Sequence, residues 1–416
     1  MKHRRIEIPP ARRDMAIRPH QTTGADSTDC GKRRRDFAKF TVLYRFARHI
    51  CDANSHDPSL EALLVMRIAQ IAPLFEAVPP KLYGGTERVV YSLTEALVEL
   101  GHDVTLFASG DSETSAKLDA PWPRALRLDP DIRDWVATYA ILIEHVAQRA
   151  HEFDVLHFHI DYWPNSVFTR MNIPFVTTLH GRLDLPEFAA VYRSFPHVPL
   201  VSISNSQRKP LPDLGWAATV LHGMPQNLLY PPIHGGQGDE KGEYFAFLGR
   251  ISPEKGIERA IRIAGACGTR LKVAAKVDKA DAEYFKESVE PLLANAHVEF
   301  IGEINDAQKP EFLGRAKATL FAIDWPEPFG LVMIESMACG TPVIAMRRGS
   351  VPEVMDDGLT GFIVDNVEEA IAACGRLGEL DRTRIRARFD ERFTSRRMAQ
   401  DYVDVYQQLI DAKKAG

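Results

Sequence analysis

The sequence predicts an α/β protein made of two Rossmann-like domains, each with a parallel sheet that helices cover on both faces. Short apolar runs alternate with amphipathic segments from Met66 onward, which is the pattern of strand, loop and helix repeated. A stretch rich in Pro, Gly and charge, YPPIHGGQGDEKGE, interrupts this pattern at 230–243 and reads as a linker. We therefore expect a leader, a first domain, a second domain and a C-terminal helix, at residues 1–65, 66–235, 236–390 and 391–416.

The first domain begins with a strand, RIAQIA, and continues with a helix, TERVVYSLTEALVELG. Apolar residues recur along that helix at helical spacing, and Gly101 follows it as a stop signal. The segment DVTLFAS then predicts the second strand. Further strands are expected at DVLHFH, PFVTTLH, PLVSIS and ATVLHG.

The second domain repeats the alternation. Its expected strands are YFAFLG, LKVAAK, VEFIG, ATLFAI and PVIAM, with helices after Lys255, at 284–293 and after Gly330. The final segment FTSRRMAQDYVDVYQQLIDA predicts an amphipathic helix. Whether this helix packs only on the second domain or crosses back to the first stays open.

The composition excludes several classes of protein. The chain has 416 residues, of which 45% are hydrophobic and 26% charged, and its net charge of −5 offers no basic field for nucleic acid. No apolar run approaches the roughly 20 residues that span a bilayer. The five cysteines are scattered without a CxxC pair, which argues against disulfides and zinc. We expect a cytoplasmic protein, and a peripheral contact with a membrane stays open.

The leader differs from the rest of the chain. Residues 1–65 contain thirteen Lys or Arg and eight Asp or Glu, without a sustained apolar period. They lack the apolar core of a signal peptide and have many acids for a transit peptide. A disordered tail and a translation start at Met66 are both compatible with this composition.

Two loops that follow strands have residues suited to an anion. In YGGTE, Gly84 and Gly85 allow the backbone to approach a ligand closely at the start of a helix, although a tight turn explains them as well. In GRISPEKG, Arg250 and Lys255 suit a diphosphate, with a solvated loop as the alternative. A cation at a helix N-terminus opposes the helix dipole, so Lys255 favours the anion site.

Histidines follow two other strands. His180 ends the strand in TTLHG and is expected to face the crevice between the domains. In HFHID, the alternation of His157, His159 and Asp161 puts all three on one face of a strand. This spacing fits a metal or a polar cleft wall, and we expect no metal because no second ligand cluster is visible.

The stretch EPFGLVMIE places two carboxylates, Glu327 and Glu335, around a Phe-Gly turn at the start of a helix. The neighbours of Glu335 are apolar, including Leu331 and Ile334. A carboxylate that only faces solvent is therefore disfavoured at Glu335.

The ordered set YGGTE, TTLHG, GRISPEKG and EPFGLVMIESMACGTPVIA resembles the retaining glycosyltransferases of family 4. EPFGLVMIE is similar to the E-x7-E motif of that family, and the resemblance covers nearly everything after Met66. The nearest likeness is to an uncharacterised bacterial branch. The resemblance implies the GT-B fold, in which two Rossmann-like domains face an interdomain cleft.

The resemblance also implies roles for the two acids and the turn between them. Glu335 would accept hydrogen bonds from the ribose of a nucleotide sugar, and Glu327 would contact hydroxyls of the transferred sugar. Phe329, Gly330 and Leu331 would present backbone N–H groups to the sugar and phosphate.

The other loops would hold the rest of the donor. Arg250 and Lys255 would neutralise the leaving diphosphate, Gly84 and Gly85 would approach the phosphates, and His180 would touch the donor sugar. Many family members have a glycine-rich turn where this chain has Lys276. This lysine is either a further contact or a change in the nucleotide pocket, so UDP and GDP donors both stay open.

The implied activity is transfer of a sugar, with retention of configuration, from a nucleotide sugar to a hydroxyl of a sugar, glycolipid or small molecule. The leaving phosphate would help to deprotonate the acceptor, with neither cofactor nor obligatory metal. Three alternatives remain: a sugar-nucleotide epimerase of the same fold, a non-catalytic nucleotide-sugar-binding protein, and a phosphorylase.

Overall fold

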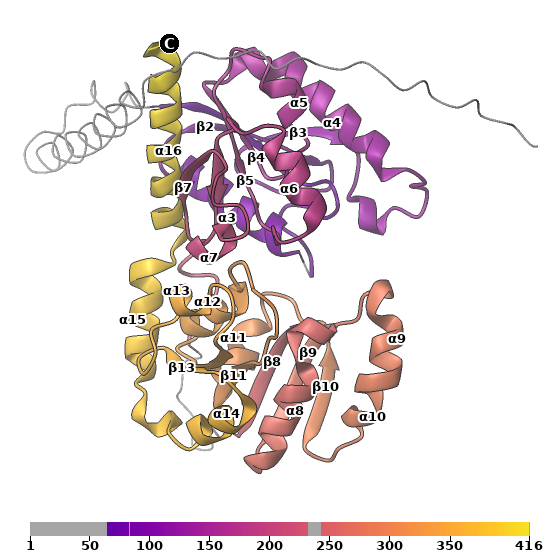
Figure 1. Cartoon of the computed structure of the whole chain (residues 1–416), viewed down its shortest axis with the longest axis vertical. Coiled ribbons are helices and arrows are strands. Elements are labelled where there is room, and N and C mark those ends of the chain that lie inside the picture. The colour runs from indigo at the N-terminus through magenta and orange to yellow at the C-terminus, as the bar shows by residue number, and fades with distance from the viewer. Residues whose placement is uncertain (1–64, 83, 232–242, 416) are drawn as a thin grey trace, which may run out of the picture. The chain divides into compact units, whose positions relative to one another are not determined.

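The structure, a computed structural model, describes residues 65–82, 84–231 and 243–415. The predicted leader up to residue 64, Tyr83 and most of the predicted linker lie outside these residues. Two parallel sheets, of seven and six strands, form the framework of the described chain (Figure 1). The predicted α/β class with two Rossmann-like sheets is confirmed.

The first sheet has the strand order β3-β2-β1-β4-β5-β6-β7, and every neighbouring pair is parallel. The order reverses between β1 and β4, and in such sheets ligands bind in the crevice outside the carboxyl ends of the strands at this point. The strands are β1 (Arg67–Ile71), β2 (Asp103–Ser109), β3 (Lys117–Trp122), β4 (Val155–Phe158), β5 (Phe175–Thr178), β6 (Leu200–Ser202) and β7 (Trp216–Thr219).

The central strands of the first sheet are buried on both faces, so helices cover both. In β1, Ile68 packs into one cluster with α3, whereas Ala69 packs into another with α4 and α6. This alternation follows from the two-residue period of a strand. The helices of this part are α3 (Gly85–Glu99), α4 (Trp135–Arg149), α5 (Asn165–Phe168), α6 (Pro186–Arg193) and α7 (Asn205–Arg208).

The second sheet has the order β10-β9-β8-β11-β12-β13 and reverses between β8 and β11. A π-helical turn, Phe285–Val289, joins α9 to α10, so the helix predicted at 284–293 is interrupted. The strands are β8 (Tyr244–Arg250), β9 (Arg270–Lys276), β10 (Val298–Gly302), β11 (Ala318–Phe321), β12 (Val343–Met346) and β13 (Gly361–Val364). The helices are α8 (Ile257–Ala266), α9 (Ala282–Tyr284), α10 (Glu290–Leu293), α11 (Lys309–Gly314), α12 (Leu331–Ala338), α13 (Val351–Val354), α14 (Val367–Cys374) and α15 (Arg382–Arg392).

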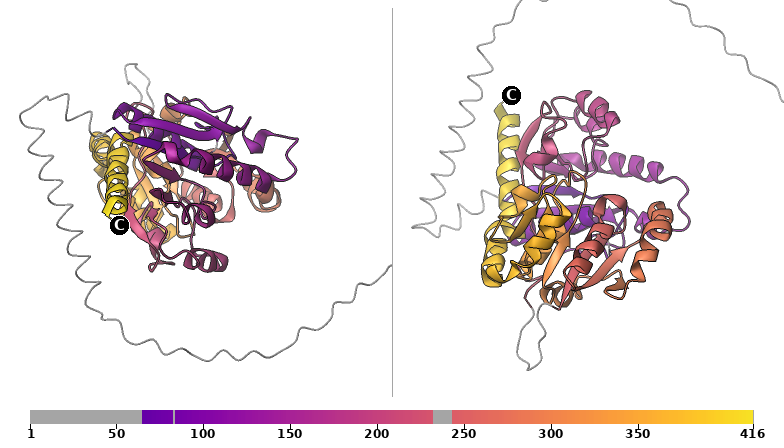
Figure 2. Two further views of the ribbon diagram at one scale, coloured as in Figure 1. Left: turned by 90° about the horizontal axis from the view of Figure 1, so that it is seen from above. Right: turned by 60° about the horizontal axis from the view of Figure 1, so that its bottom comes forward.

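The last helix, α16 (Ser395–Ala415), packs beside α3 on the first sheet (Figures 1 and 2). Its buried side chains Met398, Tyr402 and Tyr406 join Leu93 and Leu97 of α3 in one apolar cluster. The C-terminal segment thus contributes to the core under the first sheet although the second sheet precedes it in sequence.

The sequence analysis did not predict two of the strands, and it placed a third strand a few residues too late. β3 and β13 are edge strands, and β3 is half exposed and contains Pro121, which an edge strand tolerates. The half-exposed β3 has little apolar pattern, so its sequence signal is weak, whereas β13, GFIV, is buried throughout and its apolar run was not recognised. The strand predicted at ATVLHG, 218–223, lies instead at β7, which is the opposite edge of the first sheet.

Within the described part of the chain, no helix combines the length and the apolar character that a membrane span requires. The longest helix, α16, is amphipathic and has charged residues along its exposed side.

Candidate active site

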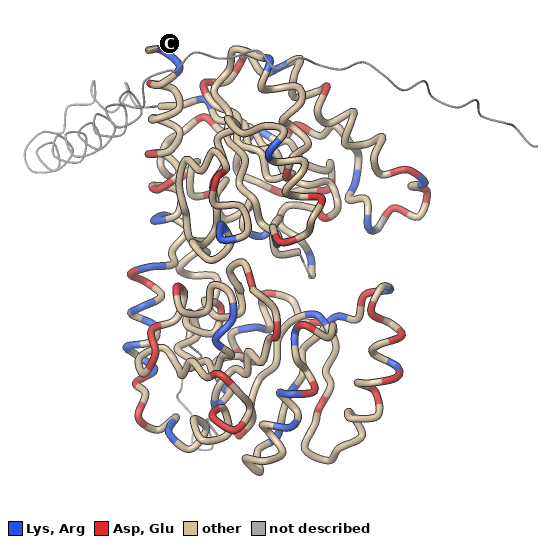
Figure 3. Tube along the Cα trace, viewed as in Figure 1, with Lys and Arg blue, Asp and Glu red and all other residues tan. Residues whose placement is uncertain are grey.

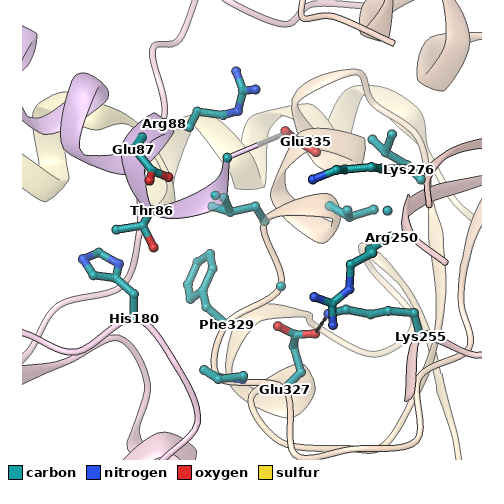
Figure 4. Close-up of a pocket in the computed structure, with 18 of the residues that line it drawn as sticks. Thr86, Glu87, Arg88, His180, Arg250, Lys255, Lys276, Glu327, Phe329 and Glu335 are labelled. Carbon is teal, nitrogen blue, oxygen red and sulfur yellow. Dashed lines mark hydrogen bonds and ion pairs between the residues drawn. The ribbon is translucent and has the colours of Figure 1, made fainter. Parts of the chain in front are cut away.

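One pocket, with a volume of about 570 Å³, brings loops of both sheets together. All eleven residues predicted from the sequence line it. They come from strand ends, from loops that follow strands of both sheets, and from the helices that these loops enter; Figure 4 labels His180, Arg250 and Glu335 among them. They are Gly84, Gly85, His180, Arg250, Lys255, Lys276, Glu327, Phe329, Gly330, Leu331 and Glu335.

The paired glycines lie at the start of α3, as predicted. A Cβ atom on Gly84 would lie 2.6 Å from Cβ of Pro80, so the close approach of the Pro80 ring to this backbone requires glycine. A Cβ on Gly85 would lie 3.7 Å from Cδ1 of Leu331, which follows β11 of the other sheet. The glycine loop therefore lies directly against the turn that contains the predicted sugar and phosphate contacts.

His180 belongs to a chain of hydrogen bonds that we call the histidine network, made of Gln70, His157, His159, His180 and Tyr406. His180 Nε2 lies 2.9 Å from His159 Nδ1, and His159 Nε2 lies 2.9 Å from Gln70 Oε1. Gln70 Nε2 donates to the Tyr406 hydroxyl at 2.9 Å, and that hydroxyl lies 2.7 Å from His157 Nδ1. The network thus links the pocket to α16.

The histidines of this network are neutral. Burial lowers the pKa of His180 to about 3 and holds the pKa values of His157 and His159 well below their usual range. Because Gln70 Oε1 can only accept, His159 Nε2 donates to it and His159 Nδ1 accepts from His180 Nε2. The other ring nitrogen of His180, Nδ1, is then a hydrogen-bond acceptor.

The predicted alternation in HFHID is only partly correct. The rings of His157 and His159 lie side by side, 4.0 Å apart between centroids, but β4 ends at Phe158 and Asp161 has a φ of 50° in the following turn. The three side chains therefore do not share a strand face. The described residues contain no group of three or more His, Cys, Asp or Glu side chains arranged to hold a metal ion.

The predicted cations lie on the loop that follows β8. Arg250 ends the strand, and its Nη2 donates to Glu254 at 2.7 Å, with Asp281 3.5 Å from its Nε. Lys255 was predicted at a helix start, but it ends a short 3₁₀ turn and α8 begins two residues later. The left-handed Gly256, with a φ of 73°, joins the turn to the helix, and a Cβ there would collide with the carbonyl of Ala322.

The turn between β11 and α12 contains Glu327, whose carboxylate is held by two neighbouring side chains. Glu327 Oε2 accepts from Lys255 Nζ at 2.6 Å and from Trp325 Nε1 at 3.0 Å, and the same ammonium lies 4.7 Å from the Trp325 ring centroid. Gly330, with a φ of 80°, begins α12, and a Cβ there would lie 2.8 Å from Met333 Cε.

Glu335 is 4% exposed, on the helix that Gly330 begins. It accepts from Lys309 Nζ at 2.5 Å, and Lys309 also pairs with Asp306 at 3.0 Å. Asp306 in turn pairs with Arg88 of α3. A chain of charges therefore runs from Glu335 to the start of α3.

Lys276 ends β9, as predicted, and its ammonium pairs with Asp278 at 2.5 Å. It lines the same pocket as Arg250, which lies opposite it in the register of β8 and β9. Three cations, Arg250, Lys255 and Lys276, thus gather at the carboxyl ends of two neighbouring strands.

Several pocket residues were not singled out by the sequence analysis. Lys309, which lines the pocket, and its partner Asp306 lie outside any motif, and no signal in the sequence marks Lys309 as the partner of Glu335. Glu87 is the last residue of the YGGTE stretch and Arg88 follows it, so that stretch marked their place. Glu87 is 6% exposed, and burial raises the pKa of its carboxyl to about 7.

The arrangement can bind an anion and a polyhydroxylated group side by side. Arginine and lysine side chains and the start of α12 offer charge and N–H groups to phosphate oxygens. Glu327, Glu335 and the acceptor nitrogen of His180 offer lone pairs to hydroxyl groups. The pocket therefore suits a ligand that combines a diphosphate with sugar rings.

Two family models match the chain. The model "Glycosyl transferases group 1" matches residues 235–392, and the model "Glycosyltransferase Family 4" matches residues 83–214. Together they match most strands of both sheets, from β2 to β6 and from β8 to β13, but not β1 or β7.

Curated relatives match over nearly their whole length. A phosphatidyl-myo-inositol mannosyltransferase of Mycolicibacterium smegmatis is 26% identical over 83% of this chain and 92% of its own. An alpha-maltose-1-phosphate synthase of the same organism is 24% identical over 82% of this chain and 99% of its own.

Solved structures share the fold. A sucrose-phosphate synthase from Thermosynechococcus elongatus aligns with a TM-score of 0.69 and 20% identity, over 83% of this chain and all of its own. HepE from Anabaena, solved in complex with UDP and glucose, aligns with a TM-score of 0.63 and 17% identity over 82% of this chain and all of its own. At these identities the likeness concerns the fold alone.

Proposed function

The chain belongs to glycosyltransferase family 4, and from this premise we propose that it transfers a sugar from a nucleoside diphosphate sugar with retention of configuration. Its two-sheet architecture is the GT-B fold, and the chain is a glycosyltransferase. The observation that carries the finer proposal is the gathering of Arg250, Lys255, Glu327, Glu335 and His180 around one pocket.

The diphosphate of the donor would lie at the cations. Breaking the bond between the sugar C1 and the phosphate oxygen leaves negative charge on the diphosphate, and the bond electrons depart with it. Arg250 and Lys255 would stabilise that charge where it develops, together with the N–H groups at the start of α12. Binding of the donor and stabilisation of the leaving group would then use the same residues.

The two carboxylates would hold opposite ends of the donor. Glu335, on α12, would accept hydrogen bonds from the ribose hydroxyls, and Glu327 would contact the transferred sugar close to the carbon that gains positive charge. Neutral His180 would accept a hydrogen bond from a sugar hydroxyl through Nδ1. The acceptor hydroxyl would attack on the face that the phosphate leaves, and its proton would pass to the departing phosphate oxygen.

Thermal shift with UDP-, GDP- and ADP-sugars tests donor binding, because a ligand that binds the native state raises the apparent stability. We expect one nucleotide series to raise Tm, and Arg250→Gln to abolish the shift. Arg262→Gln, which removes an exposed arginine of α8, is the matched control and should keep it. No shift with any nucleotide sugar would overturn the donor proposal.

The stereochemical proposal is tested on the product. With the donor identified, proton NMR of the fresh product should show the anomeric configuration of the donor. An inverted product would leave the glycosyltransferase assignment intact and remove the retaining mechanism. Donor turnover to an epimerised nucleotide sugar without any acceptor would favour the epimerase alternative.

We also propose that turnover needs no divalent metal, because Arg250, Lys255 and the start of α12 can supply the positive field at the diphosphate. Activity should persist in EDTA. Complete loss in EDTA, with recovery in magnesium or manganese, would contradict this and make a metal part of donor binding.

A further inference from the structure

Aromatic side chains form a continuous surface that begins at the pocket and extends over the first domain. The ring centroids of Phe75 and Trp135 lie 5.5 Å apart, those of Trp135 and Trp163 6.1 Å, and those of Trp163 and Tyr162 6.3 Å. Tyr162 also contacts Phe188 of α6 at 6.4 Å. We call these rings the aromatic surface: Phe75, Trp135, Tyr139, Tyr162, Trp163 and Phe188.

Three of these rings are open to solvent. Phe75 is 39% exposed, Trp135 42% and Tyr162 37%, whereas Tyr139 is buried beneath them. Aromatic side chains of this size normally bury most of their area in the core, and a contiguous exposed apolar patch marks a place where something binds.

The aromatic surface adjoins the candidate active site. Phe75 follows β1, and Tyr162 and Trp163 follow β4, so all three lie at the edge of the sheet from which His180 reaches the pocket after β5. Phe75 itself lines the pocket. A molecule lying on this surface would therefore have one end beside the proposed donor sugar.

The charges around the surface show no basic excess. In the loop before α4, three aspartates, Asp129, Asp131 and Asp134, stand against three arginines, Arg124, Arg127 and Arg133, and Arg124 pairs with Asp129 at 3.0 Å. Acidic and basic residues are mixed along this part of the chain (Figure 3). At the start of α6, Glu187 adds a further acid. This balance disfavours a phosphorylated or otherwise anionic occupant, including an anionic lipid surface.

We infer that the aromatic surface binds a neutral carbohydrate acceptor, with pyranose rings lying on Trp135 and Tyr162. The C–H faces of a pyranose are apolar and flat, so they can pack on aromatic rings while the hydroxyls stay hydrated. Successive rings from Phe75 to Tyr162 offer places for more than one sugar unit. The inference rests on the proposed function, since it names the substrate class that the same site would glycosylate.

Saturation-transfer NMR with neutral trisaccharides tests the inference directly. The probes are maltotriose and mannotriose, with trigalacturonic acid as the anionic comparison and phosphatidylcholine vesicles with phosphatidylglycerol as the lipid comparison. We expect a neutral trisaccharide to bind through its ring C–H protons. Trp135→Ala and Tyr162→Ala should each weaken that binding about 10-fold, the scale of one lost stacking contact.

Two further variants separate stacking from damage to the fold. Trp135→Phe keeps an aromatic ring and should keep most of the binding. Ile141→Ala removes an apolar side chain of α4 that is 46% exposed and lies outside the aromatic surface, so it should leave binding unchanged. Absence of binding by both neutral trisaccharides, binding only by the anionic probe or the vesicles, or unchanged binding in Trp135→Ala and Tyr162→Ala would each overturn the inference.

Donor thermal shifts on the same variants keep the two proposals apart. Trp135→Ala and Tyr162→Ala should retain the shift of the unmodified protein, because neither residue lines the pocket. A normal donor shift without trisaccharide binding would overturn the inference and leave the proposed function standing. Trisaccharide binding without any donor shift would overturn the proposed donor. The aromatic surface would then still be a carbohydrate-binding surface.

Discussion

The two sides of the pocket hold their polar side chains by different means. On the side of the first sheet, the histidine network joins uncharged groups through hydrogen bonds of 2.7 to 2.9 Å. On the side of the second sheet, the carboxylates of Glu327 and Glu335 are paired with the ammonium groups of Lys255 and Lys309.

The difference indicates which side can exchange partners with an anionic ligand. A neutral network whose members satisfy one another fixes a ring such as His180 in one orientation. A lysine ammonium, by contrast, is a mobile point charge that can pair with a carboxylate or with a phosphate. We therefore interpret the first side as the rigid wall of the site and the second side as the part that exchanges charge.

We expect the largest loss of unfolding free energy at the buried ion pair between Lys309 and Glu335. Lys309→Met would leave the Glu335 carboxylate buried beside the Lys309 position without its ammonium, at a cost of about 3–5 kcal/mol in unfolding free energy. Urea denaturation measures this loss. Arg262→Met breaks the exposed pair with Glu368 and should cost less than about 1 kcal/mol. A loss of similar size in both variants would contradict the contrast between buried and exposed charges.

Glu87 tests the difference between the neutral side and the charged side of the pocket. It lies on the side of the first sheet, where burial favours the neutral form even of a carboxyl group. Its pKa of about 7 in the native state exceeds the usual value of 4.5, so the native state binds more protons than the unfolded state between these pH values. Native stability should therefore fall as the pH rises from 4.5 to 7. Glu87→Gln removes this loss and should gain roughly 3 kcal/mol relative to the unmodified protein between pH 4.5 and pH 8.

Unfolding free energies at both pH values measure the Glu87 effect. The matched control is Glu99→Gln, at the exposed end of the same helix, which should change stability alike at both pH values. A Glu87→Gln variant whose relative stability is equally independent of pH would show that burial does not raise the pKa of this carboxyl.

Within the charged side, the two acids should differ in kinetics. Glu327→Gln removes negative charge beside the carbon that becomes cationic and should lower kcat on the order of 10²-fold. Glu335→Gln should mainly raise the donor KM, because a ribose contact is equal in the ground and transition states. Steady-state kinetics with direct donor binding distinguishes the two. Small and equal effects would mean that neither acid has its proposed role.

The smallest effect is expected in the neutral network. Tyr406→Phe removes the hydroxyl that lies 2.9 Å from Gln70 Nε2 and 2.7 Å from His157 Nδ1, at a cost of about 1–2 kcal/mol. Because no charge is involved, the loss should be the same at low and high salt. Tyr230→Phe, at a tyrosine that is 51% exposed, should be neutral. A salt-dependent loss in Tyr406→Phe would mean that the network carries charge.

Much of the fold could be predicted because its signals are local. The apolar runs of β1, β2 and β9 and the periodic helix α3 lie where the sequence predicts them. Strand ends and following loops were therefore identified, and the residues chosen there meet in one pocket. Their individual roles, and the domain boundaries, stay predictions. The edge strand β3 was missed because it is half exposed and has little apolar pattern, whereas the buried apolar run of β13 was not recognised.

The sequence by itself determined the order of strands and helices and the residues at the carboxyl ends of strands, because the two-residue and 3.6-residue periods are properties of short segments. Only the tertiary structure decided that Lys309 pairs with Glu335, 26 residues away, and that Tyr406 of α16 meets His157 of β4. It also brought Phe75, Trp135 and Tyr162 onto one surface. Such pairs arise when elements distant in sequence pack together. The periodicity of a short segment does not predict which distant side chains it will contact.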